Sequence, residues 1–170
     1  MLGRYKNFPN NIHQKENFAC SLSKRKIQEK IIQSFQKANQ ETFSFEQVGN
    51  PTILGGSVIF EFGIADSGDF NYLDAQETQR LLNTINSEPL SVMDWFCSLR
   101  YYKNAAGKKT PLRFDYYLVR MRFEEKGALE ILVSHERGPR YISPEDIVSF
   151  TVGQVNGSSA RKILKRITHN

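Results

Sequence analysis

The chain of 170 residues is 39% hydrophobic and 12% aromatic, which is enough apolar surface for a folded core and excludes a largely disordered chain. Its two cysteines, Cys20 and Cys97, are too few for a disulfide framework or a cysteine-rich zinc site, and we expect both to be free thiols. No apolar run has the length of a signal peptide or a membrane helix, so we predict a soluble, cytoplasmic protein that does not associate with membranes.

Basic side chains are concentrated at the two ends of the chain. Residues 1–41 carry a net charge of +5, residues 42–98 carry −7, and residues 99–170 carry +7. Once the chain is folded, this distribution can form a positive surface for an anionic partner. The alternative is that the basic side chains are ordinary solvated surface.

The first half of the chain contains a polar segment, a helix and two strands. Residues 1–20 are polar and predict a flexible N-terminal arm, which leaves residues 21–170 as a single α+β domain. From residue 22 to 38, apolar residues recur about every four positions, which predicts a helix with a basic outer surface that starts after Ser21 or Ser23. Alternating apolar residues predict strands at 42–48 and 57–65.

The second half has a similar mixture of elements. Asp74 and Glu77 are typical of a capping box at the start of a helix that ends near residue 86 or 87. Strands are expected at 90–103, 112–123 and 129–134, followed by helices from Pro144 to about residue 152 or 155 and at 160–167. The sequence therefore predicts an α+β fold, a mainly antiparallel twisted sheet of about five strands flanked by helices, in the order α-β-β-α-β-β-β-α-α.

Two of the expected strands have a face that is not wholly apolar. In 90–103 every odd-numbered residue from Met93 to Tyr101 is apolar or aromatic, so the even-numbered residues form a second, mixed face. In 112–123 the apolar positions change parity near Leu118, which predicts a β-bulge or a strong bend there.

Motifs for catalysis or metal binding are incomplete. His135 follows Ser134 directly, so the two side chains point to opposite faces of a strand, and we interpret His135 as a strand-end histidine. Residues 66–77 resemble a calcium loop only at its ends, and residues 106–110 lack the first glycine of a phosphate-binding loop. We predict no catalytic residue, no metal site and no cofactor.

The mixed face favours a non-enzymatic protein that binds nucleic acid. Aromatic rings and guanidinium groups on one open sheet face are typical of single-stranded DNA or RNA binding, because rings stack on bases while cations contact phosphates. A basic loop between the two strands extends this surface. The candidate residues are Phe96, Arg100, Tyr102, Lys103, Lys108, Lys109, Arg113, Tyr117, Arg120 and Arg122.

Two other functions are compatible with the same residues. The aromatic face can be the interface of a structural or adaptor protein, either with a second copy of the chain or with a protein partner. An enzyme acting on an anionic substrate would use Arg137 and Arg140 with a carboxylate that the sequence does not identify.

Overall fold

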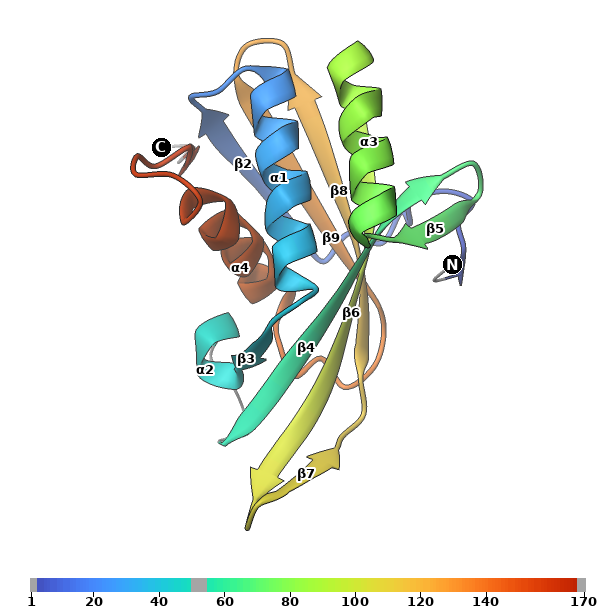
Figure 1. The fold of residues 1–170 in the computed structure, drawn as a ribbon, viewed down its shortest axis with the longest axis vertical. Helices are drawn as coiled ribbons and strands as arrows, with labels where there is room; N and C mark the ends of the chain where they lie inside the picture. The colour runs from blue at the N-terminus through green and yellow to red at the C-terminus, as the bar shows by residue number, and fades with distance from the viewer. Residues whose placement is uncertain (1–2, 50–54, 168–170) are drawn as a thin grey trace.

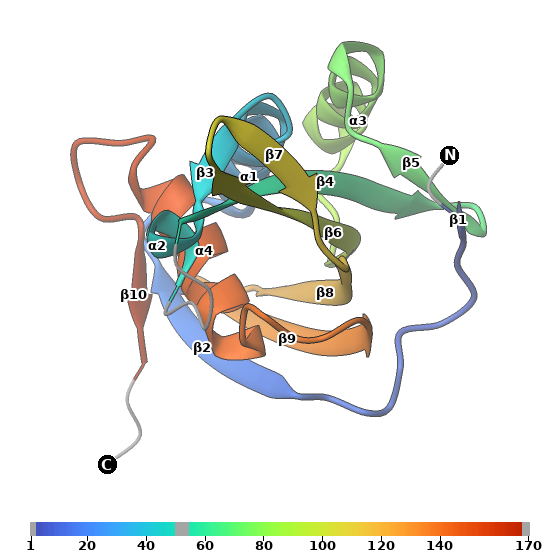
Figure 2. The same cartoon turned by 90° about the horizontal axis from the view of Figure 1, so that it is seen from below.

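One large antiparallel sheet is the framework of the protein. The computed structural model describes residues 3–49 and 55–167, which contain ten strands and four helices. The sheet follows the path β1-β5-β4-β6-β8-β9-β2-β10, while β3 pairs with β4 and β7 pairs with β6 (Figures 1 and 2). The strands are β1 (Gly3–Arg4), β2 (Gln14–Cys20), β3 (Thr42–Ser44), β4 (Gly56–Asp66), β5 (Asp69–Tyr72), β6 (Val92–Ala105), β7 (Lys108–Pro111), β8 (Asp115–Glu124), β9 (Ala128–Arg137) and β10 (Leu164–Arg166).

The helices are α1 (Lys24–Ala38), α2 (Phe45–Val48), α3 (Ala75–Ser87) and α4 (Pro144–Asn156). Three begin as the sequence predicts, because the side chains of Ser23, Asp74 and Ser143 accept a hydrogen bond from a backbone N–H in the first turn. The sheet curls around α1 and α4, so it has an inner face against these helices and an outer face away from them (Figure 2). Within the described residues, no helix is long and apolar enough to cross a membrane.

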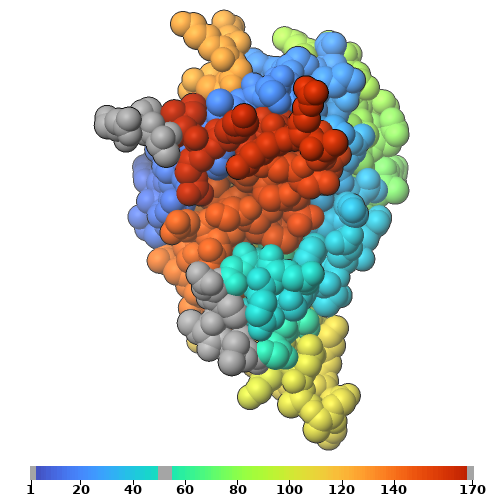
Figure 3. Space-filling view, turned by 90° about the vertical axis from the view of Figure 1, so that its left-hand side faces the viewer, coloured from blue at the N-terminus to red at the C-terminus, as the bar shows by residue number. Residues whose placement is uncertain are grey.

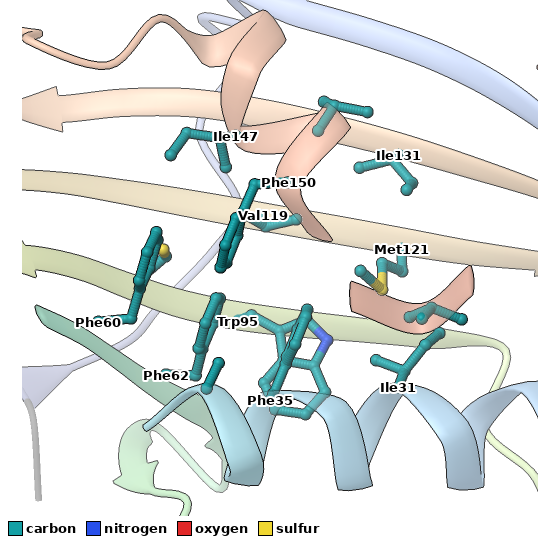
Figure 4. Packing of buried hydrophobic residues seen from close by; sticks show 14 of the residues in the cluster. Ile31, Phe35, Phe60, Phe62, Trp95, Val119, Met121, Ile131, Ile147 and Phe150 are labelled. Carbon is teal, nitrogen blue, oxygen red and sulfur yellow. The ribbon is translucent and has the colours of Figure 1, made fainter. Parts of the chain in front are cut away.

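The core lies between the inner face of the sheet and the helices. Phe35 of α1 stacks on Phe62 of β4 with 4.1 Å between ring centroids, and Phe150 of α4 stacks on Phe60 at 4.4 Å. Trp95 of β6 is fully buried and meets Phe35 edge to face (Figure 4). These offset and edge-to-face contacts add to the hydrophobic burial that joins both helices to the sheet.

The predicted mixed fold and the antiparallel sheet are confirmed, but the expected five strands and their order are wrong. The five predicted strands correspond to β3, β4, β6, β8 and β9, and the sheet has five more. Two of these, β1 and β2, lie in the segment predicted to be a flexible arm. Residues 14–19 pair with 128–133 of β9. This pairing makes β2 a strand although its polar sequence does not predict one.

The predicted last helix, residues 160–167, is also wrong. Leu164–Arg166 form β10, which pairs with residues 18–20 of β2. The side chain of Asn156 accepts hydrogen bonds from the backbone N–H groups of Ile163 and Leu164 and donates one to the carbonyl of Leu164. The Asn156 side chain thus supplies hydrogen bonds that the backbone of residues 163–164 would otherwise make within a helix, so these residues can be extended.

The predicted strand at 42–48 is only partly correct. Residues 42–44 form β3, but residues 45–48 form α2, where Ser44 and Gln47 make a reciprocal capping box. The spacing Ser-x-x-Gln is a helix signal that the alternation of Phe43 and Phe45 obscured.

Removal of the Phe150 ring should destabilise the protein strongly. Phe150 is 5% exposed and contacts the rings of Phe43 and Phe60, so we expect Phe150→Ala to reduce the free energy of unfolding by about 3–5 kcal/mol. Urea unfolding followed by circular dichroism measures this. The exposed neighbour Ser149 is the control, and Ser149→Ala should change stability by less than about 0.5 kcal/mol. Equal effects of the two substitutions would contradict the packing described here.

Candidate functional site

A pocket lined by aromatic rings lies on the outer face of the sheet, where β6, β7 and the start of β8 meet. Its volume is about 360 Å³. Four of its lining residues are aromatic residues whose side chains are partly or largely exposed, and one acid and one base contribute opposite charges. The lining residues are Glu61, Phe96, Ser98, Arg100, Tyr101, Tyr102, Pro111, Leu112, Phe114 and Tyr116.

Strand alternation brings three of the predicted residues to this pocket. Met93, Trp95, Cys97, Leu99 and Tyr101 of β6 are buried in the core, as expected from the sequence. The intervening residues Phe96, Arg100 and Tyr102 therefore point to the outer face. The prediction of a mixed, partly open face on this strand is confirmed.

Two further rings, from Phe114 just before β8 and Tyr116 within it, were not predicted as site residues. Phe114 is 45% exposed, and its ring lies 5.0 Å from that of Tyr116 in an edge-to-face arrangement. Tyr116 is in turn 5.4 Å from the ring of Phe96. The three rings form a connected aromatic surface, and rings of this kind are suited to stacking on planar ligands.

An ion pair forms the polar wall of the pocket. Glu61 of β4 lies opposite Ser98 of β6, and Nη2 of Arg100 is 2.5 Å from Oε1 of Glu61. The side chain of Arg100 is 55% exposed and that of Glu61 is 20% exposed, so the pair borders solvent. Burial, followed by the negative charge of Glu61, raises the pKa of nearby Tyr72.

A basic hairpin stands next to the pocket. β6 and β7 are joined by a tight turn in which Ala106 and Gly107 both have positive φ, and the hairpin projects from the body of the protein (Figures 1 and 3). It carries Lys103, Lys108 and Lys109, all exposed. Nζ of Lys109 lies 5.0 Å from the ring centroid of Tyr102, so one cation directly borders the aromatic surface.

These lysines are free to meet an anion. Within residues 3–49 and 55–167, no ion pair involves Lys103, Lys108, Lys109 or Arg113. Residues 100–114 contain five basic side chains and no acidic one. Arg113 is exposed beside the pocket without lining it. The hairpin therefore supplies an uncompensated positive charge at the edge of the rings.

The prediction that Tyr117 lies on the open face is wrong. Tyr117 is fully buried on the inner face, and its hydroxyl donates a hydrogen bond to the carbonyl of Ile142. β8 keeps one parity throughout: its outer residues are Tyr116, Leu118, Arg120 and Arg122, apolar first and then basic. The irregularity near Leu118 is a register shift between Tyr116 and Tyr117, where β9 has an extra residue.

A buried carboxylate explains this orientation of β8. Asp115 is fully buried, and its two oxygens accept hydrogen bonds from the Tyr101 hydroxyl and from the backbone N–H groups of Arg140 and Tyr141. Nε2 of His135 lies 2.8 Å from its Oδ1. These four polar partners compensate for the loss of water around Asp115. The residue can therefore lie on the inner face, although its charge predicts the outer one. His135 is thus part of a buried cluster rather than a free strand-end residue.

Arg120 and Arg122 lie on the outer face but away from the pocket, and both have partners. Two nitrogens of Arg120 each lie 2.8 Å from an oxygen of Asp94, and these hydrogen bonds raise the pKa of Arg120. Arg122 is 3.6 Å from Glu130. Neither arginine shares a site with the rings, contrary to the sequence-based prediction.

An N-terminal strap, residues 5–13, crosses the outer face beside these arginines (Figure 2). The Tyr5 hydroxyl donates to Asp94, and burial together with that carboxylate raises the pKa of Tyr5 to about 12. The ring of Phe8 packs 4.8 Å from the Arg120 guanidinium. Ser134 donates a hydrogen bond to the carbonyl of Asn11. The strap thus occupies part of the outer face and leaves the aromatic pocket outside it.

Other chemistry has little support in the described part of the chain. It contains no group of three or more His, Cys, Asp or Glu residues that could hold a metal ion. Cys97 is buried, and burial raises the pKa of its thiol, which disfavours the reactive thiolate. The backbone N–H of Arg140 donates a hydrogen bond to Asp115, so this carboxylate is already engaged in the structure.

No protein-family model, curated protein or solved structure matches this chain.

Acidification should loosen the attachment of the strap. Nδ1 of His13 accepts a hydrogen bond from the backbone N–H of His135 at 2.9 Å, which requires an unprotonated Nδ1. Burial, then the charges of Arg140 and His135, lowers the pKa of His13 from 6.5, while Glu136 opposes this. The His13 imidazole therefore binds a proton more readily in the unfolded chain than in the folded one. Its contribution to the stability of the fold is present above pH 6.5 and is lost as the pH falls through the lowered pKa.

The comparison is between the wild type and His13→Asn, whose side-chain oxygen can accept the same hydrogen bond but does not titrate. Urea unfolding at about pH 7.5 and about pH 5.5 should show a smaller loss of stability on acidification in the variant. The same loss in both proteins would contradict a role for His13.

Proposed function

We propose that this protein is a non-enzymatic nucleic-acid-binding protein that takes single strands on the outer face of its sheet. The observation that carries the proposal is the connected surface of Phe96, Phe114 and Tyr116 in an open pocket beside a hairpin of three lysines that form no ion pair within residues 3–49 and 55–167. Rings bind the faces of bases, and cations bind the phosphates that join them. The two kinds of group lie next to each other, as a single nucleic-acid strand requires.

The geometry favours single strands over duplex. The rings line a pocket of about 360 Å³ and can be reached only by a base that is not stacked within a helix. The adjacent lysines can follow the backbone of such a strand, and the contact between Lys109 and Tyr102 places one cation where the strand would enter. Duplex could contact only the lysines, so its binding would be weaker and purely electrostatic.

The first test measures binding of labelled single-stranded DNA, single-stranded RNA and duplex by fluorescence anisotropy. We expect single strands to bind more tightly than duplex, and the affinity to fall steeply between about 50 mM and about 200 mM salt. No binding of any single strand at the lower salt concentration would refute the proposal.

The rings of the pocket should contribute to affinity directly. Phe114→Ala and Tyr116→Ala are each expected to weaken single-strand binding by about 1–3 kcal/mol, because each removes a ring on which a base can stack. Val92→Ala is a matched control, since Val92 is an exposed apolar residue on the outer face of the same sheet outside the pocket. Binding that falls equally in all three variants, or in none, would contradict stacking in the pocket.

The hairpin lysines should act by neutralising phosphates. The double variant Lys108→Ala, Lys109→Ala is expected to weaken binding to all sequences alike and to reduce the slope of log affinity against log salt by about 0.7 for each phosphate that is no longer neutralised. Lys37→Ala with Lys126→Ala removes the same charge from exposed sites on α1 and on the β8–β9 turn. An equal change of slope in both double variants would show that only net charge matters.

A second candidate function is that of an adaptor whose aromatic face binds another protein or a second copy of the chain. The exposed ring of Phe114, beside the half-buried Leu112, favours this reading. Light scattering after gel filtration, which measures the oligomeric state, distinguishes the adaptor from the nucleic-acid-binding protein. A dimer that dissociates on Phe114→Ala, in a protein without affinity for oligonucleotides, would favour the adaptor.

A further inference from the structure

The polar wall of the pocket presents a defined pattern of hydrogen-bonding groups. Arg100 and Glu61 meet between Nη2 and Oε1. Within the described part of the chain, neither side chain forms an ion pair with a third residue. Side by side, the pair therefore offers donors from the guanidinium and acceptors from the carboxylate to whatever enters between the rings.

We propose that this pocket selects guanine, an inference that rests on the proposed single-strand function. The Watson–Crick edge of guanine carries one acceptor, O6, followed by two donors, N1–H and the N2 amino group. The guanidinium of Arg100 matches the acceptor, and the carboxylate of Glu61 matches the two donors. Cytosine and adenine place a donor toward Arg100, and uracil or thymine places a second acceptor toward Glu61, so each leaves at least one unfavourable contact.

The position of the pair explains why a mismatch would be costly. Glu61 is only 20% exposed, and Phe96 lines the same pocket. A base that covers this carboxylate removes water from it, and a base without N–H groups at the right places leaves it without compensation. Sites built from such groups reject the wrong ligand more strongly than apolar pockets do.

The aromatic residues line the same pocket as the ion pair and give the base ring faces on which to stack. Phe114, Tyr116 and Phe96 form a continuous surface from the exposed rim to the inner part of the pocket. Because every base can stack on a ring, stacking supplies affinity without choice of sequence. Selection would come from Arg100 and Glu61 alone, so affinity and selectivity can be separated by mutation.

The test uses nine-nucleotide strands of thymidine with one central guanine, inosine, adenine or cytosine, which have too few guanines to associate with one another. Wild-type protein should bind the guanine strand about tenfold or more tightly than the adenine or cytosine strand. The inosine strand, which lacks the N2 amino group, should bind with intermediate affinity. This comparison requires no variant and so does not depend on how a substitution affects folding.

Glu61→Gln replaces one carboxylate oxygen by an amide donor and should reduce the preference for guanine to within about threefold while the other strands bind as before. Glu16→Gln is the matched control. Glu16 of β2 is also a strand glutamate paired with an arginine, Arg166 at 2.7 Å, and it lies outside the pocket. This variant should keep the full preference.

The two levels of the proposal fail in different ways. If the wild type binds all four strands with equal affinity and Phe114→Ala weakens this binding, guanine selection is overturned and the proposed function stands. Guanine preference that survives Glu61→Gln would overturn the role of the ion pair. Absence of binding to every strand at low salt would overturn both.

Discussion

The alternation of side chains along β6 is the constraint on which the rest of the structure depends. β6 is the longest strand, and both β4 and β8 are hydrogen-bonded to it over most of its length. Its inner residues lie in the core, where Trp95 is fully buried against Phe35. Successive residues of a strand face opposite sides, so Phe96 and Arg100 must lie outside, and a slip of one residue would exchange the core with the site.

Asp115 fixes the neighbouring strand in the same way. A fully buried carboxylate is tolerated only with polar partners around it, and here these are the Tyr101 hydroxyl, His135 and two backbone N–H groups of the loop before α4. Gly138 belongs to this arrangement, because it has a φ of 111° and an added Cβ would lie 2.3 Å from the carbonyl oxygen of Phe114. With Asp115 held inside, its neighbours Phe114 and Tyr116 face outward and complete the aromatic surface.

The outer face is divided by charge and by coverage. At one end Arg120 is neutralised by Asp94 and covered by the strap through Tyr5 and Phe8, which makes this part structural. At the other end the hairpin lysines have no acidic partner in the described chain, and the rings stay open. Basic residues that look equivalent in the sequence thus have different roles, because a cation beside a fixed carboxylate contributes little to binding a distant phosphate.

What the sequence determined by itself is local. The caps of α1, α3 and α4, the alternation in β4 and β6 and the basic hairpin follow from spacing and turn residues that act over a few positions. Only the tertiary structure decided that Gln14–Cys20 and Leu164–Arg166 are strands, and that Tyr117 faces inward while Tyr116 faces outward. Short polar strands form when a neighbour satisfies their backbone, and a buried Asp or Tyr is stable only when distant residues supply its hydrogen bonds. Glu61 and Arg100 lie 39 positions apart and meet only through the pairing of β4 with β6, so no local pattern reveals that they share a pocket.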